Sequence, residues 1–353
     1  MLFRSRQLGD DMTGQHVLHD ISQTIAEVTG VTAADLGDDL LACDQPLVLR
    51  GLASDWPAVE HALESADKII DYLLGFDSNN VVTALYAPPE AGGRIFYNED
   101  LSAFNFEYRR MALKDAVRQV RSHVDLPSPP SLYIGSTNVD HWLPGFREQN
   151  DLPIRHLEPL ASIWIGNQSR VSAHYDFPAN IACVVAGQRR VILFPPEQLP
   201  NLYVGPLDFT PAGQPISLVD FHAPDYERFP KFREAVKTAR MSVLEPGDAI
   251  IVPSMWWHHM EALGAFNVLV NYWWRSSPSY MGPPLSVLQH AMLGLRDLPA
   301  AQRKQWQGLF DFYVFNPAPE NFEHIPQAAR GVLNPIDEPT ARQIRKMLRD
   351  KLL

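Results

Sequence analysis

The sequence predicts a mainly β fold with flanking helices. Residues 130–280 consist largely of short apolar runs separated by Pro, Gly and Asp, a pattern typical of strands joined by turns. Apolar residues recur at intervals of three and four before and after this part, as in helices that bury one face. We therefore expect three regions: an N-terminal α/β region over 1–125, a β core over 126–280 and a helical region over 281–353.

The N-terminal region is expected to mix helices and strands. Helical spacing of apolar residues predicts helices over 19–28, 63–74 and 111–124. Runs of β-favouring residues predict strands over 45–51 and 80–86. We expect these elements to pack on the β core.

The C-terminal region carries three apolar stripes with helical spacing. They consist of Leu285, Leu288, Met292 and Leu295, then Trp306, Leu309, Phe310 and Tyr313, and finally Ile344, Met347, Leu348 and Leu352. One copy of so short a region offers little surface to cover all three stripes. We therefore expect a homodimer in which a second copy covers them.

Candidate metal ligands lie in two strand-like segments of the core. His174 and Asp176 are two residues apart, so in a strand their side chains point to the same side. His258 follows a predicted turn at 246–248 and a short buried strand over Ala249–Val252. Two histidines and one carboxylate on one face of a metal leave the other face open for O₂ and a co-substrate, as in non-haem Fe(II) oxygenases. The pattern therefore predicts an iron site.

The choice between two adjacent histidines stays open on pattern alone. His258 and His259 point to opposite sides of a strand, and either suits a metal. A histidine and an aspartate two residues apart are most often ordinary surface or core residues. The prediction of an iron site therefore depends on the whole pattern and not on His174 and Asp176 alone.

The strand after Gly187 places one arginine inside the core. Alternation puts Arg189 and Arg190 on opposite faces. An unpaired cation inside a barrel is costly, so the inward arginine needs a bound carboxylate or an internal ion pair, unless it lies at the rim. Asn271, in a later apolar strand, likewise needs a ligand or a backbone hydrogen bond.

Residues 203–245 are predicted to be too irregular for strands. They contain five prolines, which lack the N–H group that a strand ladder uses. We expect either a long insert that covers the site or a well-packed surface loop.

The composition limits the classes of partner. The chain has 353 residues, a hydrophobic content of 46% and a formal net charge of −11. The apolar content suffices for a large core, and the absence of a dense Lys/Arg run argues against a nucleic-acid partner. No uncharged apolar stretch approaches the ~18 residues of a membrane span, so we expect no membrane partner.

Cysteine usage favours a reducing compartment. Cys43 and Cys183 have neither a CxxC nor a zinc-type spacing, and Cys183 lies in an apolar run that predicts a buried thiol. Residues 1–11 lack the apolar segment of a secretory signal. We expect a cytoplasmic protein.

Several stretches of the core share their order and spacing with a known family. They are Ala173-His174-Tyr175-Asp176, residues 190–196, Val219-Asp220-Phe221, Gly247-Asp248, Trp256-Trp257-His258-His259 and Val270-Asn271-Tyr272-Trp273. With these stretches, residues 131–275 resemble the jumonji-C/cupin-like family of Fe(II)- and 2-oxoglutarate-dependent oxygenases, and in particular its asparaginyl hydroxylases. The resemblance implies a double-stranded β-helix (jelly-roll or cupin) core of two four-stranded antiparallel sheets, with the metal between them toward the open end. It also implies that the helical C-terminus forms the homodimer interface.

The resemblance implies a role for each site residue. The metal ligands would be His174, Asp176 and His258, and the co-substrate residues would be Tyr133, Arg189, Asn180 and Asn271. Tyr133 would donate its hydroxyl to the distal carboxylate of 2-oxoglutarate. Arg189, which stands where the asparaginyl hydroxylases have a lysine, would supply the cation. Decarboxylation of 2-oxoglutarate to succinate and CO₂ would drive hydroxylation, with ascorbate as an assisting reductant.

Three residues depart from the asparaginyl hydroxylase pattern. Val171 replaces a hydroxyl-bearing residue, and Pro178 and Gly135 replace glutamines that touch the peptide. The implied activity is hydroxylation of a side chain in a protein or peptide. Two alternatives stay open: the same chemistry on a small-molecule metabolite, and a non-catalytic metal-binding cupin that recruits partners.

Overall fold

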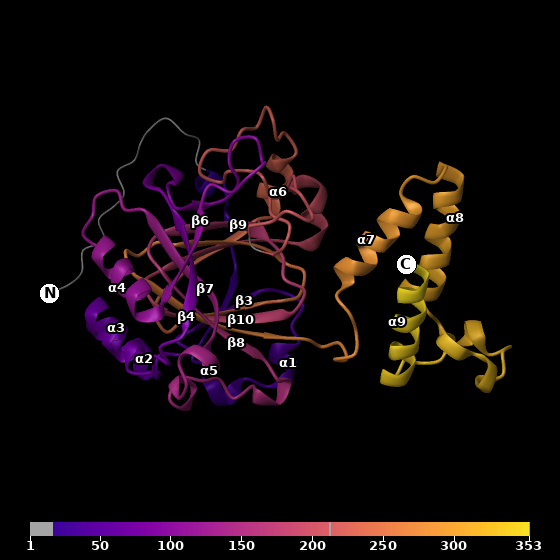
Figure 1. Cartoon of the computed structure of the whole chain (residues 1–353), viewed down its shortest axis with the longest axis horizontal. Helices are drawn as coiled ribbons and strands as arrows, with labels where there is room; N and C mark the ends of the chain where they lie inside the picture. The colour runs from indigo at the N-terminus through magenta and orange to yellow at the C-terminus, as the bar shows by residue number, and fades with distance from the viewer. Residues whose placement is uncertain (1–16, 212, 353) are drawn as a thin grey trace. The chain divides into compact units, whose positions relative to one another are not determined.

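Two β-sheets and the helices around them make up most of the computed structural model, which describes residues 17–211 and 213–352 (Figure 1). The strands are β1 (Gln23–Thr24), β2 (Ala26–Thr29), β3 (Leu47–Arg50), β4 (Val81–Ala87), β5 (Arg94–Ile95), β6 (Glu107–Ala112), β7 (Ser131–Asn138), β8 (Leu160–Gly166), β9 (Ser169–His174), β10 (Ala179–Ala186), β11 (Arg189–Phe194), β12 (Arg240–Leu244), β13 (Ala249–Val252), β14 (Trp257–Ala262) and β15 (Asn267–Trp274). The α-helices are α1 (Asp38–Leu41), α2 (Pro57–Glu64), α3 (Ala66–Leu74), α4 (Leu113–His123), α5 (Val139–Trp142), α6 (Phe232–Thr238), α7 (Pro284–Leu295), α8 (Ala300–Phe310) and α9 (Glu338–Leu352).

The chain divides into two compact units between Ser276 and Ser277. The first unit holds both sheets, and the second holds α7, α8 and α9. Strands β3, β4 and β6, which come from the expected N-terminal region, join the same sheet as core strands. The three-region division stays a prediction.

The two sheets contain a double-stranded β-helix core. Among the described residues, one sheet has the order β1-β12-β11-β14-β9-β5 and the other the order β2-β3-β13-β10-β15-β8-β7-β4-β6. Within them, β12-β11-β14-β9 and β13-β10-β15-β8 are fully antiparallel sets of four strands. The expected mainly β fold with flanking helices is confirmed.

Strand β10 shows why the core strands read as unbroken apolar runs. Ile181 and Cys183 pack into the hydrophobic core under the helices α2, α3 and α4, which lie together on one face of the nine-stranded sheet (Figure 1). Ala182 and Val184, on the other face of β10, pack into the core between the sheets. Both faces are buried, so the polar-apolar alternation of a half-exposed strand is absent.

Two sequence predictions in the N-terminal region are corrected. The predicted helix over 19–28 is wrong: β1 and β2 lie there and pair in parallel with β12 and β3. Ile21 and Ile25 are buried in two different cores, and their spacing of four mimics one helical turn. The predicted helix over 63–74 is two helices, because extended backbone at Ser65 ends α2 while its Oγ accepts the Lys68 N–H at 3.2 Å to begin α3.

The prediction for 203–245 is correct only in part. An isolated bridge joins Val204 and Ser217, and the other described residues of the segment are irregular as far as α6. The residues Arg240–Leu244 nevertheless form β12, which completes a ladder with β11. The last of the five prolines, Pro230, precedes β12. Every residue of β12 therefore has a backbone N–H group that can take part in strand pairing.

Asp248 ties the N-terminal part of the first unit to the core. Its carboxylate accepts hydrogen bonds from Arg50 Nη1 at 2.6 Å, from the Gly51 N–H at 2.9 Å and from the Glu245 N–H at 3.0 Å. The preceding Gly247 has a φ of +94°, and a Cβ atom there would lie 2.5 Å from Ser54 Oγ. The Gly247-Asp248 pair therefore fixes a turn that a residue with a side chain would distort.

We expect Asp248→Asn to lower the free energy of unfolding by about 2 kcal/mol, because a neutral amide weakens the bond to Arg50 and turns an N–H group toward the remaining donors. Urea denaturation of the purified protein measures this change. The exposed Asp208→Asn is the matched control and should leave the midpoint unchanged. Equal midpoints for both variants would contradict this role of Asp248.

The second unit leaves much of its apolar surface exposed. Leu293 in α7 is 81% exposed, and Trp306 in α8 and Met347 in α9 are also exposed. Across the described residues, no helix combines the length and the apolar character needed to cross a membrane.

Candidate active site

The register of β9 and β14 brings the candidate metal ligands together. His174 and His258 are direct neighbours in this antiparallel pair, and Asp176 lies just beyond the end of β9. One potential ligand atom from each of the three residues lies within 4.8 Å of the other two. His258 Nε2 is 3.7 Å from Asp176 Oδ2.

Backbone carbonyl groups fix the orientation of both imidazole rings. His174 Nδ1 lies 2.9 Å from the Ser172 carbonyl oxygen, and His258 Nδ1 lies 3.0 Å from the Trp256 carbonyl oxygen. A ring nitrogen beside a carbonyl must donate, so each Nε2 keeps a lone pair for a metal. Burial lowers the pKa of His258 to about 4, helped by the neighbouring His174, so this imidazole is neutral at pH 7.

Trp273 positions the carboxylate of Asp176. Its indole Nε1 donates to Asp176 Oδ2 at 2.9 Å, and the Met255 N–H donates to the Asp176 carbonyl oxygen at 2.9 Å. The role of Trp273 was not predicted. The signal was present, because alternation along its strand places Trp273 on the same face as Asn271.

All the site residues expected from the sequence line one cavity of about 420 Å³. These are His174, Asp176, His258, Tyr133, Arg189, Asn180 and Asn271. The cavity lies between the two sheets, since β7, β10 and β15 belong to one sheet and β9, β11 and β14 to the other.

Arg189 is a buried cation without a salt bridge among the described residues. Only 4% of the residue is exposed, and its Nε has no hydrogen-bond partner in this part of the chain. Burial lowers the pKa of Arg189, and the nearby Tyr133 acts in the opposite direction. Burial also raises the pKa of Tyr133 to about 12, so its phenol stays protonated and can donate. A guanidinium and a phenol donor at one cavity fit a carboxylate group, as 2-oxoglutarate offers.

The two asparagines bind one another. Asn271 Nδ2 donates to Asn180 Oδ1 at 3.0 Å, and Trp164 Nε1 donates to Asn271 Oδ1 at 2.7 Å. The protein partners of Asn271 are thus side chains and not a backbone group, and contact with a ligand stays a prediction. Both asparagines still line the cavity.

His259 lies on the opposite face of β14 from His258. Its Nε2 is 2.9 Å from Glu261 Oε1, which is also 2.7 Å from His222 Nε2, and Arg190 Nη1 donates to Glu261 Oε2 at 2.7 Å. Burial raises the pKa of Glu261, but the hydrogen bonds from His222 and His259 outweigh it and hold that pKa well below its usual range. The geometry therefore places His258, and not His259, with His174 and Asp176.

The departures from the asparaginyl hydroxylase pattern have structural consequences. Gly135 lines the cavity, and a Cβ atom there would lie 2.0 Å from the Trp164 ring, so no side chain fits while Trp164 stays in place. Val171 also lines the cavity. Pro211 and Gln214, from the irregular 203–245 segment, reach the same cavity, so this segment covers part of the site.

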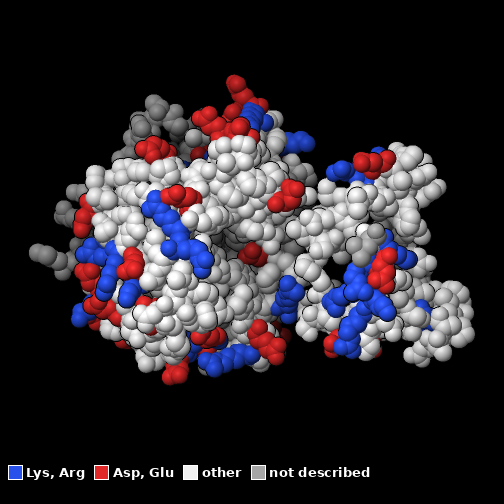
Figure 2. Space-filling model, viewed as in Figure 1, with Lys and Arg blue, Asp and Glu red and all other residues white. Residues whose placement is uncertain are grey.

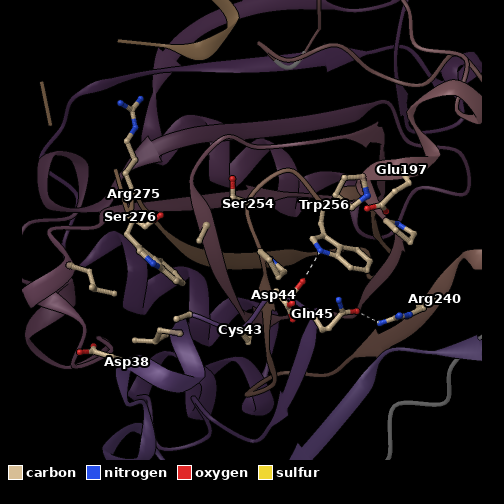
Figure 3. Close-up of a pocket in the computed structure, with 18 residues that line it drawn as sticks. Asp38, Cys43, Asp44, Gln45, Glu197, Arg240, Ser254, Trp256, Arg275 and Ser276 are labelled. Carbon is tan, nitrogen blue, oxygen red and sulfur yellow. Dashed lines mark hydrogen bonds between the residues drawn. The ribbon is translucent and has the colours of Figure 1, made fainter. Parts of the chain in front are cut away.

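A second cavity, of about 790 Å³, lies beside the turn between β13 and β14 (Figure 3). Ser254 and Trp256 of this turn form part of its wall. Trp256 Nε1 donates to the Asp44 carbonyl oxygen at 3.0 Å, and Arg240 Nη1 donates to Gln45 Oε1 at 3.1 Å. None of the three candidate metal ligands lines this cavity, so it is separate from the candidate active site.

Comparison with known proteins finds relatives with several different names. The lysine-specific demethylase JMJ31 of Arabidopsis thaliana is 33% identical over 121 residues, which cover 33% of this chain and 22% of the relative. HSPB1-associated protein 1 of Bos taurus is 24% identical over 253 residues, 66% of this chain and 49% of the relative. The tRNA wybutosine-synthesizing protein 5 of Danio rerio is 37% identical over 107 residues, 30% of this chain and 29% of the relative. The matches span about half the length of these relatives or less.

A family model described as a cupin-like domain matches residues 33–280. This span includes both four-stranded antiparallel sets and the candidate metal ligands His174, Asp176 and His258. The chain belongs to the cupin-like, jumonji-C domain family.

Proposed function

We propose that this protein is an Fe(II)- and 2-oxoglutarate-dependent dioxygenase that hydroxylates a side chain of a protein or peptide. The observation that carries the proposal is the shared cavity: two histidines and an aspartate converge in it, and it is also lined by Arg189, a buried cation with no ion-pair partner among the described residues. A metal alone needs no buried arginine. A metal together with a dicarboxylate co-substrate uses both features.

Different residues would bind the metal and the co-substrate. His174, Asp176 and His258 would hold Fe(II) on one face, with Trp273 keeping the carboxylate in place. Arg189 and the protonated Tyr133 would bind the distal carboxylate of 2-oxoglutarate. When bound, Fe(II) would let O₂ take two electrons from 2-oxoglutarate, which becomes succinate and CO₂ and keeps one oxygen atom, and two electrons from the substrate, whose C–H bond becomes C–OH with the other oxygen atom.

The names of the relatives support a macromolecular substrate without identifying it. JMJ31 is a lysine-specific demethylase, which implies action on a protein side chain, and this agrees with the finer resemblance to asparaginyl hydroxylases. Another relative is named as a tRNA wybutosine-synthesizing protein, a name that refers to RNA and not to a protein substrate. We keep the proposal of a protein or peptide substrate, without nucleic-acid or membrane partners and in the cytoplasm, because the chain has a net charge of −11 and free thiols.

We expect wild-type protein with Fe(II), ascorbate and 2-oxoglutarate in air to form succinate slowly even without substrate, and His174→Ala to abolish this turnover because one of three metal ligands is lost. Succinate is quantified by mass spectrometry. The exposed His324→Ala is the matched control and should behave as wild type. Absence of turnover, together with absence of anaerobic 2-oxoglutarate binding by calorimetry, would contradict the proposal and favour a non-catalytic cupin.

We expect Arg189→Met to weaken anaerobic 2-oxoglutarate binding by ~10- to 100-fold, because a charged hydrogen-bond partner of the carboxylate is removed. Arg189→Lys should weaken it less, because an ammonium keeps the charge but not the forked geometry. Isothermal calorimetry with Mn(II) in place of Fe(II) measures both. Without co-substrate, Arg189→Met should not lower the urea midpoint, because it removes an uncompensated buried charge. A clear loss of stability would mean that Arg189 has a structural partner instead.

The homodimer remains part of the proposal. The exposed apolar residues on α8 and α9 belong to the predicted stripes, among them Trp306 and Met347. On α7 the prediction is correct only in part, because Val287 and Leu293 are exposed beside Leu288, whereas Leu285, Met292 and Leu295 are half-buried. We expect size-exclusion chromatography with light scattering to give twice the monomer mass. The double variant Trp306→Glu and Met347→Glu should give the monomer mass, because it puts two charges into an apolar interface. A strict monomer for wild type at micromolar concentration would contradict the dimer.

A further inference from the structure

The cavity of the candidate active site extends across the nine-stranded sheet to its last strand. Tyr133 in β7 is the register partner of Leu85 in β4, and Leu85 is the partner of Tyr108 in β6. Register partners on neighbouring strands point to the same face of a sheet. All three residues line the cavity, so its wall runs from the expected co-substrate residue Tyr133 out to the sheet edge at Tyr108.

Strand β6 is an open edge at the mouth of this cavity. Within the described ranges, β6 pairs only with β4, and no other backbone segment bonds to its outer side. Tyr108 is 56% exposed, and Glu107 and Arg110 are also exposed. An open edge of this kind presents unpaired N–H and C=O groups to which an extended chain can add.

The edge of the opposite sheet is closed in contrast. Strand β5 is the last strand of that sheet, and its Ile95 lines the same cavity. The side chain of Asn105 occupies the backbone groups there: its Nδ2 donates to the Arg94 carbonyl oxygen at 2.8 Å, and its Oδ1 accepts the Phe96 N–H at 2.9 Å. Of the two sheet edges beside the cavity, β6 is therefore the one that can accept another strand.

The side chains of β6 indicate the charge of the segment that would add. The Arg109 guanidinium lies 3.3 Å over the Tyr86 ring and forms an ion pair with Glu107, so its positive charge is compensated within the protein. Arg110 lies on the other face of the strand, with Tyr108, and has no ion pair or hydrogen bond with the described residues. Figure 2 shows basic side chains over the region of β6, next to a hollow in this face of the molecule.

We propose that the substrate binds as an extended peptide segment that pairs with the free edge of β6, inserts one side chain past Tyr108 into the cavity and places an acidic side chain against Arg110. Tyr108 and Arg110 are two residues apart, so the inserted and the acidic residue of the segment are also two positions apart. Backbone pairing with β6 gives affinity without sequence preference, and the two side-chain contacts select the segment. This inference rests on the proposed function, because it deepens the identity of the substrate.

The test selects displayed random short peptides on the full chain, loaded with Mn(II) and 2-oxoglutarate. We expect enriched peptides to share an Asp or Glu two positions from a common residue. Arg110→Glu should weaken their binding by ~10-fold, because it turns an attraction into a repulsion. Arg118→Glu, which reverses an exposed charge on α4, is the matched control and should leave binding unchanged. Amide hydrogen exchange should slow over residues 107–112 when a peptide binds.

Three outcomes would overturn the inference: no enriched peptide, equal binding to the Arg110→Glu and Arg118→Glu variants, or unchanged hydrogen exchange over 107–112. Thermal melting of each variant checks that it folds, and Tyr108→Ala provides a second probe of the edge that leaves the charge intact. None of these readouts uses turnover. A protein that binds 2-oxoglutarate but selects no peptide therefore refutes strand addition alone, whereas one that does not bind 2-oxoglutarate refutes the proposed function.

Discussion

A buried cation without a partner in the described chain is the constraint on which the site depends. Arg189 lies between two sheets whose inner faces are largely apolar, where an uncompensated charge is costly. The ladder between β11 and β14 pairs Arg189 with Ala262 and Leu193 with His258. Four residues of strand, roughly 13 Å, thus separate the arginine from the level of a metal ligand. The arginine side chain spans part of this distance. The remainder limits the length of any molecule that contacts both the guanidinium and the metal.

Hydrogen bonds on the outer face of β14 and β11 support the site. Along β14, His258 faces the cavity while His259 and Glu261 face away from it. Glu261 binds His259, His222 and Arg190 and is nearly fully buried, so this outer network fixes β14 against β11 and the irregular segment. Two adjacent histidines therefore have different tasks, because a strand points successive side chains to opposite sides.

Sequence reasoning succeeded where a local rule decides the structure. Alternation alone indicated that one of Arg189 and Arg190 is buried. The spacing of His174 and Asp176 also pointed to one site, although β9 ends at His174 and Asp176 follows it. Sequence reasoning failed where distant segments decide. Residues 19–28 contain short strands because β12, far along the chain, and β3 offer edges to pair with. The hydrogen bond from Trp273 to Asp176 likewise depends on two strands meeting in space, and the pattern gave only the face on which Trp273 lies.

The residues proposed for metal binding and those proposed for substrate selection come from different parts of the chain. The triad, Arg189 and both asparagines lie in or next to the eight strands β8–β15, which fall within the residues that the family model matches, whereas Tyr133 lies in β7. The outer wall of the cavity includes Leu85, Ile95, Tyr108, Pro211, Gly213 and Gln214, all outside those eight strands. The three metal ligands lie outside this wall, whereas Leu85 and Ile95 pack against the expected co-substrate residue Tyr133. Relatives that demethylate lysine and relatives named for tRNA modification can therefore share one core, and the substrate of this chain has to be sought from the residues at its own cavity mouth.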